Sequence, residues 1–330
     1  MSEKGAIVGH LNRRRQLLEL ARGCSIPHAI VLAGPRAIGK QRIGRAFAHA
    51  VLCKTPGTIA LLNEGGCGSC ESCRLAARGN HPDLTVVDCS DKAAVTTEKI
   101  RELLGGIQLR PFLGGSRAIV FLDAEGLSVQ ASNILLKSLE EPTAGTYFIL
   151  TASNPSQLPA TLLSRCQIWF FDALSPEEIQ AVLSGDSKLR PLAEQYTALT
   201  SLLGGTLELI EEVGADPERW LTAQTLTIEC GRGSAEAFHT LVTSFGSKKE
   251  LAATALHVFR VTAAAQMRSS SDPVTQQRWA TFLTNTLSAE RAIFERNLHP
   301  QYVFQVILMN LLSERASATA EGLLERVLPV

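Results

Sequence analysis

Five short runs of β-branched and aromatic residues, separated by segments with helical spacing, constrain the first half of this chain more than any other feature. The runs lie at residues 29–34, 83–88, 117–123, 146–152 and 167–171. Apolar runs of this length are typical of strands buried on both faces, and helices between them imply parallel crossover connections. The sequence therefore predicts an α/β domain with a parallel sheet over residues 1–172.

The rest of the chain has a different pattern. Ser175 is followed by Pro176 and two glutamates, which is typical of the first turn of a helix. Further along, apolar positions recur at helical spacing, with breaks near residues 204–205, 214–220, 267–273 and 297–300. These breaks predict a small helical domain over residues 173–213 and an all-helical domain over 214–330.

The overall charge and hydropathy exclude some classes of function. The chain has 32 basic and 32 acidic residues, which argues against a protein that binds nucleic acid through a positive surface of its own. The segment "MSEKGAIVGHLNRRR" lacks the apolar core of a secretion signal, and no apolar run reaches the ~18 residues that a membrane span requires. We expect a cytoplasmic protein with no membrane partner, whose eight cysteines stay reduced.

Four of the cysteines have the spacing of a metal site. Cys67, Cys70 and Cys73 are separated by two residues each, and Cys53 precedes them. Exposed thiols in a loop rich in glycine and serine would oxidise readily unless they were ligated. We predict a structural Zn²⁺ site of four thiolates, with a set of free cysteines as the alternative. The other cysteines stand alone and are expected to be buried apolar residues: Cys24, Cys89, Cys166 and Cys230.

The stretch "GPRAIGKQ" resembles a phosphate-binding loop. Gly34, Gly39 and Lys40 have the expected spacing, between a predicted strand and an amphipathic helix. The stretch ends in Gln41, where Ser or Thr would help to hold magnesium. We therefore predict a degenerate nucleotide site, at which retention of ATP or ADP stays open. The alternative is a tight turn whose glycines serve the backbone alone.

A second departure affects the residues that hydrolysis would need. The third run ends at Asp123, which is followed by Ala124 and Glu125 where Asp-Glu would be expected. A glutamate displaced by one residue is expected to point elsewhere, so the attacking water would lose the group that orients it. At the end of the fourth run, Thr151 and Asn154 are placed to touch a terminal phosphate, although turn chemistry explains them equally well.

Several motifs together carry a family resemblance. "HAIVLAG", "CGSCESC", "NHPDL", "ASNILLKSLEEP" and "LPATLLSRCQ" occur in this order. Over about residues 9–172 the chain resembles the delta-prime family of bacterial DNA polymerase III clamp-loader subunits, which belong to the AAA+ class. The segment "NLHPQYVFQVILMNLL" is similar to one that these proteins use in their C-terminal collar.

The resemblance implies a fold, a function and partners. The fold would be an α/β P-loop domain (AAA+, RecA-like) with an inserted four-cysteine zinc module, then a small helical lid domain and an all-α collar domain. The chain would join gamma/tau and delta subunits in a hetero-pentamer that uses ATP to place the sliding beta clamp on primer-template DNA. Gln41 and Ala124 favour a largely non-hydrolysing stator. The alternative is an ATP-hydrolysing motor of the gamma/tau type, or a zinc-stabilised interaction module with no role in replication.

The resemblance also assigns a role to Arg165 of the "SRC" motif. In this family the arginine projects into the ATP site of a neighbouring subunit, where a guanidinium stabilises charge on the transferred phosphoryl group. Arg165 is therefore the predicted catalytic residue, acting in trans as an arginine finger in a chain that is not expected to be catalytic alone. Taken by itself, the residue can equally be a surface salt-bridge partner.

Overall fold

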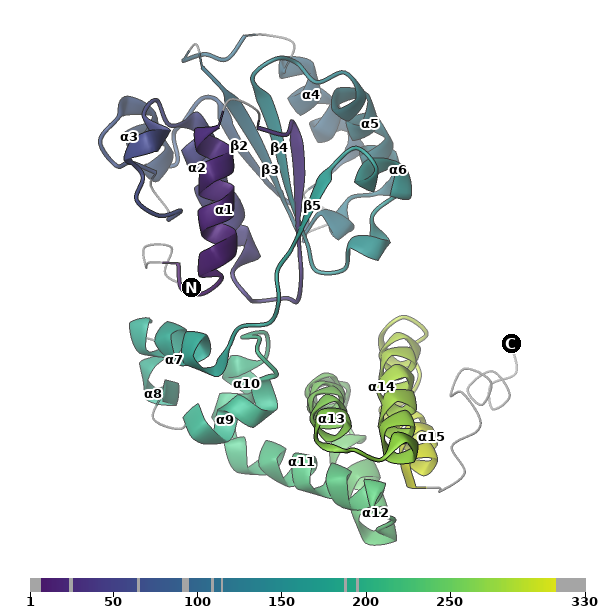
Figure 1. Ribbon diagram of the computed structural model, residues 1–330. Helices are drawn as coiled ribbons and strands as arrows, with labels where there is room; N and C mark the ends of the chain where they lie inside the picture. Colours follow the sequence, from purple (N-terminus) through teal and green to yellow (C-terminus); the bar gives the residue numbers. More distant parts are fainter. Residues whose placement is uncertain are drawn as a thin grey trace. The chain divides into compact units, whose positions relative to one another are not determined.

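The computed structural model describes residues 7–23, 26–63, 66–90, 95–107, 110–113, 115–186, 189–193 and 196–312. The chain divides into two compact units, residues 1–187 and 188–330, and each is described by itself (Figure 1). Among the helices within the described ranges, none is long and apolar enough to cross a membrane.

The first unit is built on a parallel sheet of five strands in the order β2-β3-β4-β1-β5. The strands are β1 (Ala29–Ala33), β2 (Leu84–Asp88), β3 (Arg117–Leu122), β4 (Thr146–Ala152) and β5 (Gln167–Phe170). Each lies within one of the predicted runs, so the predicted parallel α/β architecture is confirmed. The connection from β1 runs toward the β2 edge of the sheet, whereas the connection from the neighbouring β4 runs the opposite way, to β5. Ligands of such sheets usually bind beside the strand ends at a reversal of this kind, which here includes the loop after β1.

Helices cover both faces of this sheet (Figure 1). On one face, Val31, Phe121 and Leu150 of three strands share a buried core with α4 (Thr97–Gly106), α5 (Val129–Glu140) and α6 (Ala160–Leu163). On the other face lies α2 (Lys40–Leu52), and α1 (Leu11–Arg22) packs against it. Gly44 brings α2 close to the sheet, since an added Cβ would lie 3.4 Å from the Thr151 methyl group.

Shorter elements complete the first unit. They are η1 (Pro56–Thr58), α3 (Glu71–Ala77), η2 (Ala124–Gly126), η3 (Pro155–Gln157) and α7 (Pro176–Gly185). As predicted, Ser175 begins α7: its hydroxyl accepts from the backbone N–H of Glu178, whose carboxylate in turn accepts from the N–H of Ser175.

The described part of the second unit is helical. Its helices are α8 (Arg190–Ala193), α9 (Tyr196–Leu203), α10 (Ile210–Ala215), α11 (Pro217–Gly231), α12 (Ala235–Phe245), α13 (Lys249–Ser269), α14 (Pro273–Phe294) and α15 (Pro300–Leu312). The four breaks predicted near residues 204–205, 214–220, 267–273 and 297–300 are confirmed, whereas the breaks at 232–234 and 246–248 were not predicted. Gly204 and Gly205 both have positive φ between α9 and α10, which ends the helix at little steric cost. The further division at residues 172 and 213 stays a prediction.

Candidate nucleotide cradle and metal centre

The loop from β1 to α2 uses its two glycines for backbone geometry. A Cβ on Gly34 would lie 2.2 Å from the carbonyl oxygen of Phe171, at the end of β5. Gly39 directly precedes α2 and has a φ of 94°, which is unfavourable for residues other than glycine. Both glycines therefore have a structural role whether or not a phosphate binds.

Lys40 lies at the mouth of this loop and is 4% exposed. Its ammonium group donates to the carbonyl oxygen of Pro35 (2.5 Å) and to the hydroxyl of Ser153 (3.4 Å), just beyond β4. The ammonium group that would bind a phosphate therefore already donates to two oxygens of the chain itself.

Gln41 and Asp123 are brought together by the fold. The Gln41 side-chain N–H donates to a carboxylate oxygen of Asp123 at 2.9 Å. Asp123 follows β3 with φ at 49°, and its backbone N–H donates to the hydroxyl of the fully buried Thr151 (2.9 Å). The Asp123 carboxylate thus points toward Gln41, the second residue of α2, while the Asp123 backbone is bonded to β4.

The two residues after Asp123 are committed to other contacts. Ala124 is fully buried in the core beneath the sheet. One carboxylate oxygen of Glu125 accepts from the backbone N–H of Ser153 (2.8 Å), while the other is buried without a hydrogen-bond partner in the described ranges. Asn154 is exposed, and its side chain caps the start of η3 by accepting from the N–H of Ser156 (3.1 Å). Asn154 therefore serves the local turn.

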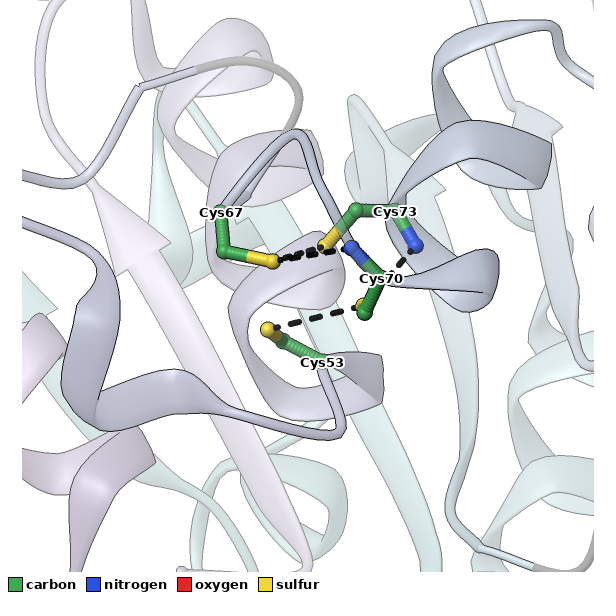
Figure 2. A group of neighbouring side chains, drawn as sticks. All are labelled: Cys53, Cys67, Cys70 and Cys73. Carbon is green, nitrogen blue, oxygen red and sulfur yellow. Dashed lines mark hydrogen bonds between the residues drawn. The ribbon is translucent and has the colours of Figure 1, made fainter.

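The four predicted zinc ligands converge on one point (Figure 2). Cys53 directly follows α2, Cys67 and Cys70 precede α3, and Cys73 lies within it. All four sulfurs lie within 4.8 Å of one another, with Cys53 to Cys70 at 3.9 Å and Cys67 to Cys73 at 3.7 Å. A tetrahedral zinc site with Zn–S bonds of about 2.3 Å has S···S edges of about 3.8 Å. The cluster could therefore hold a metal ion, since two of its sulfur pairs already lie at the tetrahedral distance.

Hydrogen bonds orient these sulfurs. Three backbone N–H groups donate to them at 3.4 Å, from Thr55 to Cys53, from Cys70 to Cys67 and from Cys73 to Cys70. The Ser69 hydroxyl and the Cys70 N–H lower the pKa of the Cys67 thiol to about 4. Burial raises the pKa of Cys53 and of Cys73. Four sulfurs this close can all be ionised only beside a cation, which is the condition that a divalent metal meets.

His81 of the "NHPDL" motif contacts Ser72, a residue of α3 that lies next to the cysteine cluster. The Ser72 hydroxyl donates to the carbonyl oxygen of Leu52 (2.7 Å), next to Cys53, and contacts Nε2 of His81 (2.8 Å). Nδ1 of His81 accepts from the backbone N–H of Asp83 (3.0 Å), so His81 carries its proton on Nε2 and donates it to Ser72. Ser72 therefore ties α3 to the end of α2, where the first ligand lies.

Part of the chain is similar to known proteins. A family model described as "DNA polymerase III, delta subunit" matches residues 12–175. The DNA polymerase III subunit delta' of Pseudomonas aeruginosa is 37% identical over 140 residues, covering 42% of this chain and 41% of that protein. The chain belongs to the delta-prime family of DNA polymerase III subunits.

Other members of the polymerase match as well. Subunit delta' of Yersinia pestis is 35% identical, in an alignment that covers 58% of this chain and 56% of that protein. Subunit tau of Salmonella typhimurium is 32% identical, in an alignment that covers 65% of this chain and 34% of that protein. The chain spans about half the length of the delta-prime relatives it matches. A solved gamma subunit-related protein from Thermotoga maritima aligns with 92% of this chain and 99% of its own, at 15% identity and a TM-score of 0.40.

In this delta-prime family member, Arg165 follows α6 and is bound within its own chain. Its guanidinium lies 2.6 Å from the carboxylate of Glu140, at the end of α5, and donates to the carbonyl oxygen of Thr161 (2.7 Å). The Arg165 side chain is 34% exposed. The residue is thus an accessible cation held by a surface ion pair, which is the alternative that the sequence left open.

One residue of the cradle was missed by sequence reasoning. His10 donates through its backbone N–H to the Glu178 carboxylate (3.0 Å), and its ring nitrogen Nε2 contacts the carbonyl oxygen of Ile38 (3.1 Å). The ring packs edge-on against Phe171, with centroids 5.2 Å apart. Burial lowers the pKa of His10. This residue links the loop before α2 to the start of α7, and no local pattern singles it out.

The solitary cysteines match their prediction in part. Cys89 and Cys230 are buried, Cys166 is half-buried, and Cys24 lies outside the described residues.

Proposed function

We propose that this chain is a largely non-hydrolysing delta-prime subunit of a DNA polymerase III clamp loader. In this role it assembles with gamma/tau and delta subunits into a hetero-pentamer, which places the sliding beta clamp on primer-template DNA. Family membership supports the assignment to the loader. The neutral charge of the chain is consistent with DNA contacts that are shared with other subunits.

The burial of Ala124 carries the non-hydrolysing part of the proposal. Hydrolysis of ATP needs an acidic or polar side chain that orients the attacking water. At the position after Asp123 the chain has a methyl group with no exposed surface. The next carboxylate along the chain, that of Glu125, accepts from the backbone N–H of Ser153. The cradle keeps the geometry of a phosphate site and lacks the group for the chemistry.

Finer features belong to the same proposal. Residues 1–172 form an AAA+ (RecA-like) domain, with a lid domain over 173–213 and a collar over 214–330. Cys53, Cys67, Cys70 and Cys73 hold a structural Zn²⁺, which the distances between their sulfurs support. Arg165 acts in trans as an arginine finger at a neighbour's ATP site, which its exposed ion pair permits.

Two measurements on the purified chain test the function. Magnesium-dependent ATP turnover should not exceed that of a Lys40→Ala variant. The chain should also co-purify with delta and gamma/tau subunits of the same organism. Substantial turnover that Lys40→Ala abolishes would instead favour a motor of the gamma/tau type, an alternative that the similarity to tau subunits keeps open. Failure to bind any loader subunit would contradict the role in replication.

A further inference from the structure

We infer that the Gln41 side-chain amide is a built-in substitute for the divalent cation of this cradle. It occupies the Asp123 carboxylate, keeps magnesium out, and joins the start of α2 to the end of β3 without a metal. The inference deepens the proposed function and rests on it only for the identity of the nucleotide. The hydrogen bond between Gln41 and Asp123 is observed in the structure and does not depend on the proposed function.

The position of the contact carries the first step. Gln41 is the second residue of α2, and Asp123 directly follows β3, 82 positions along the chain. Their side chains meet at 2.9 Å. The Asp123 backbone is anchored by its N–H bond to the buried Thr151 hydroxyl, so the carboxylate is presented to α2 by the fold.

The chemistry of magnesium carries the second step. Mg²⁺ requires oxygen ligands at about 2.0–2.1 Å in octahedral geometry and retains several waters. An N–H donor at 2.9 Å takes up the lone pair and the space that a bound cation or its water would need. A hydroxyl in place of Gln41 would offer an oxygen, whereas the bonded –NH₂ end of the amide offers only donors.

Neighbouring groups agree with a cradle that needs no cation. The Lys40 ammonium contacts the Pro35 carbonyl and the Ser153 hydroxyl. The second acid nearby, Glu125, is bonded to the Ser153 N–H. The Lys40 ammonium, one carboxylate oxygen of Asp123 and one of Glu125 are thus already engaged by groups of the chain. These contacts suit a subunit whose own conformation stays the same while neighbouring subunits bind and hydrolyse ATP.

Nucleotide binding in the presence of Mg²⁺ or of EDTA tests the exclusion of metal, with a fluorescent ADP as the probe and the full chain as the protein. Wild type should bind ADP equally well in both. Gln41→Thr, which removes the amide and adds a hydroxyl, should gain about tenfold in affinity with Mg²⁺. Gln41→Asn, which keeps the amide but shortens its reach and adds no hydroxyl, is the matched control and should not gain. Adding Asp123→Asn to Gln41→Thr should remove the gain.

Two results would overturn the exclusion of metal. One is wild-type binding that depends on Mg²⁺ and is lost in Asp123→Asn. The other is a Gln41→Thr protein that shows no Mg²⁺-dependent binding. Either can occur while the chain still co-purifies with loader subunits, so the proposed function and this inference fail separately.

Urea unfolding without metal or nucleotide tests the cross-link. Gln41→Ala and Asp123→Ala should each lower the urea midpoint, and the double variant should lower it little further, because both remove the same contact. Additive shifts would contradict a cross-link between these side chains.

Discussion

The guanidinium of Arg165 lies 2.6 Å from the carboxylate of Glu140, so the residue proposed to act on a neighbour is paired within its own chain. Both side chains are partly exposed, at 34% and 49%. An exposed pair of this kind contributes about 0–1 kcal/mol to stability, which a phosphate on a neighbouring subunit can replace. The salt-bridge and finger interpretations of Arg165 are therefore compatible, with Glu140 holding the side chain in place before assembly.

Replacing Arg165 by Ala should leave the loader assembled and lower its DNA- and clamp-stimulated ATPase, by up to ~10³-fold if the finger is fully used. Glu140→Gln should retain activity, because it frees the guanidinium without removing it. Arg101→Ala, at an exposed position of α4, is the control. The measurement is steady-state ATP turnover of the reconstituted complex. Wild-type turnover in Arg165→Ala would rule out the finger.

The cysteine cluster should carry about one equivalent of zinc, and Cys70→Ser should lose it, because three thiolates and a hydroxyl hold the ion far less well. We expect local unfolding around α3 while the sheet persists, visible by hydrogen exchange. Cys166→Ser, outside the cluster, should keep its metal. Elemental analysis of native protein that finds no bound metal would refute the site.

Ser72→Ala should destabilise the protein by about 1–3 kcal/mol, because it leaves the Leu52 carbonyl and the His81 N–H without their buried partner. Urea unfolding measures the loss. Ser156→Ala, at an exposed position, should change stability by less than about 0.5 kcal/mol. Equal effects of the two substitutions would mean that Ser72 does not brace the cluster.

The two loop glycines should respond differently to alanine. In Gly34→Ala the new Cβ meets the Phe171 carbonyl at 2.2 Å, so the backbone must move, at a cost of about 1–3 kcal/mol. Gly39→Ala meets no atom within 4 Å and carries only the strain of its positive φ, about 1 kcal/mol. Thermal unfolding of both variants compares them. A larger loss in Gly39→Ala would contradict the packing argument.

Burial, together with the nearby His81 and Arg45, lowers the pKa of His49 on α2 from 6.5 to about 4. The unfolded chain then binds more protons than the folded one between these pH values, so stability falls as the pH drops from about 6.5 toward 4. We expect His49 to contribute on the order of 3 kcal/mol to this loss. His49→Gln should flatten the pH dependence of urea unfolding over this window. Metal content measured at each pH separates this effect from zinc release, and an unchanged slope would contradict it.

Much of the fold follows from local patterns. Each of the five strands lies in a short apolar run, because a strand of a parallel sheet is buried on both faces and its sequence records that burial directly. The four-cysteine cluster is equally local, since three of its members lie within seven residues and the spacing limits how they can face one another.

The sequence by itself thus determined the sheet, the helical second half, the set of cysteines and the substitutions at Gln41 and Ala124. Only the tertiary structure decided what Gln41 does, because its partner Asp123 lies 82 positions away and is reached through strand order. The same holds for His10 with Glu178, 168 positions apart. Hydrophobic periodicity records burial, whereas a hydrogen-bond partner depends on which elements the fold makes neighbours.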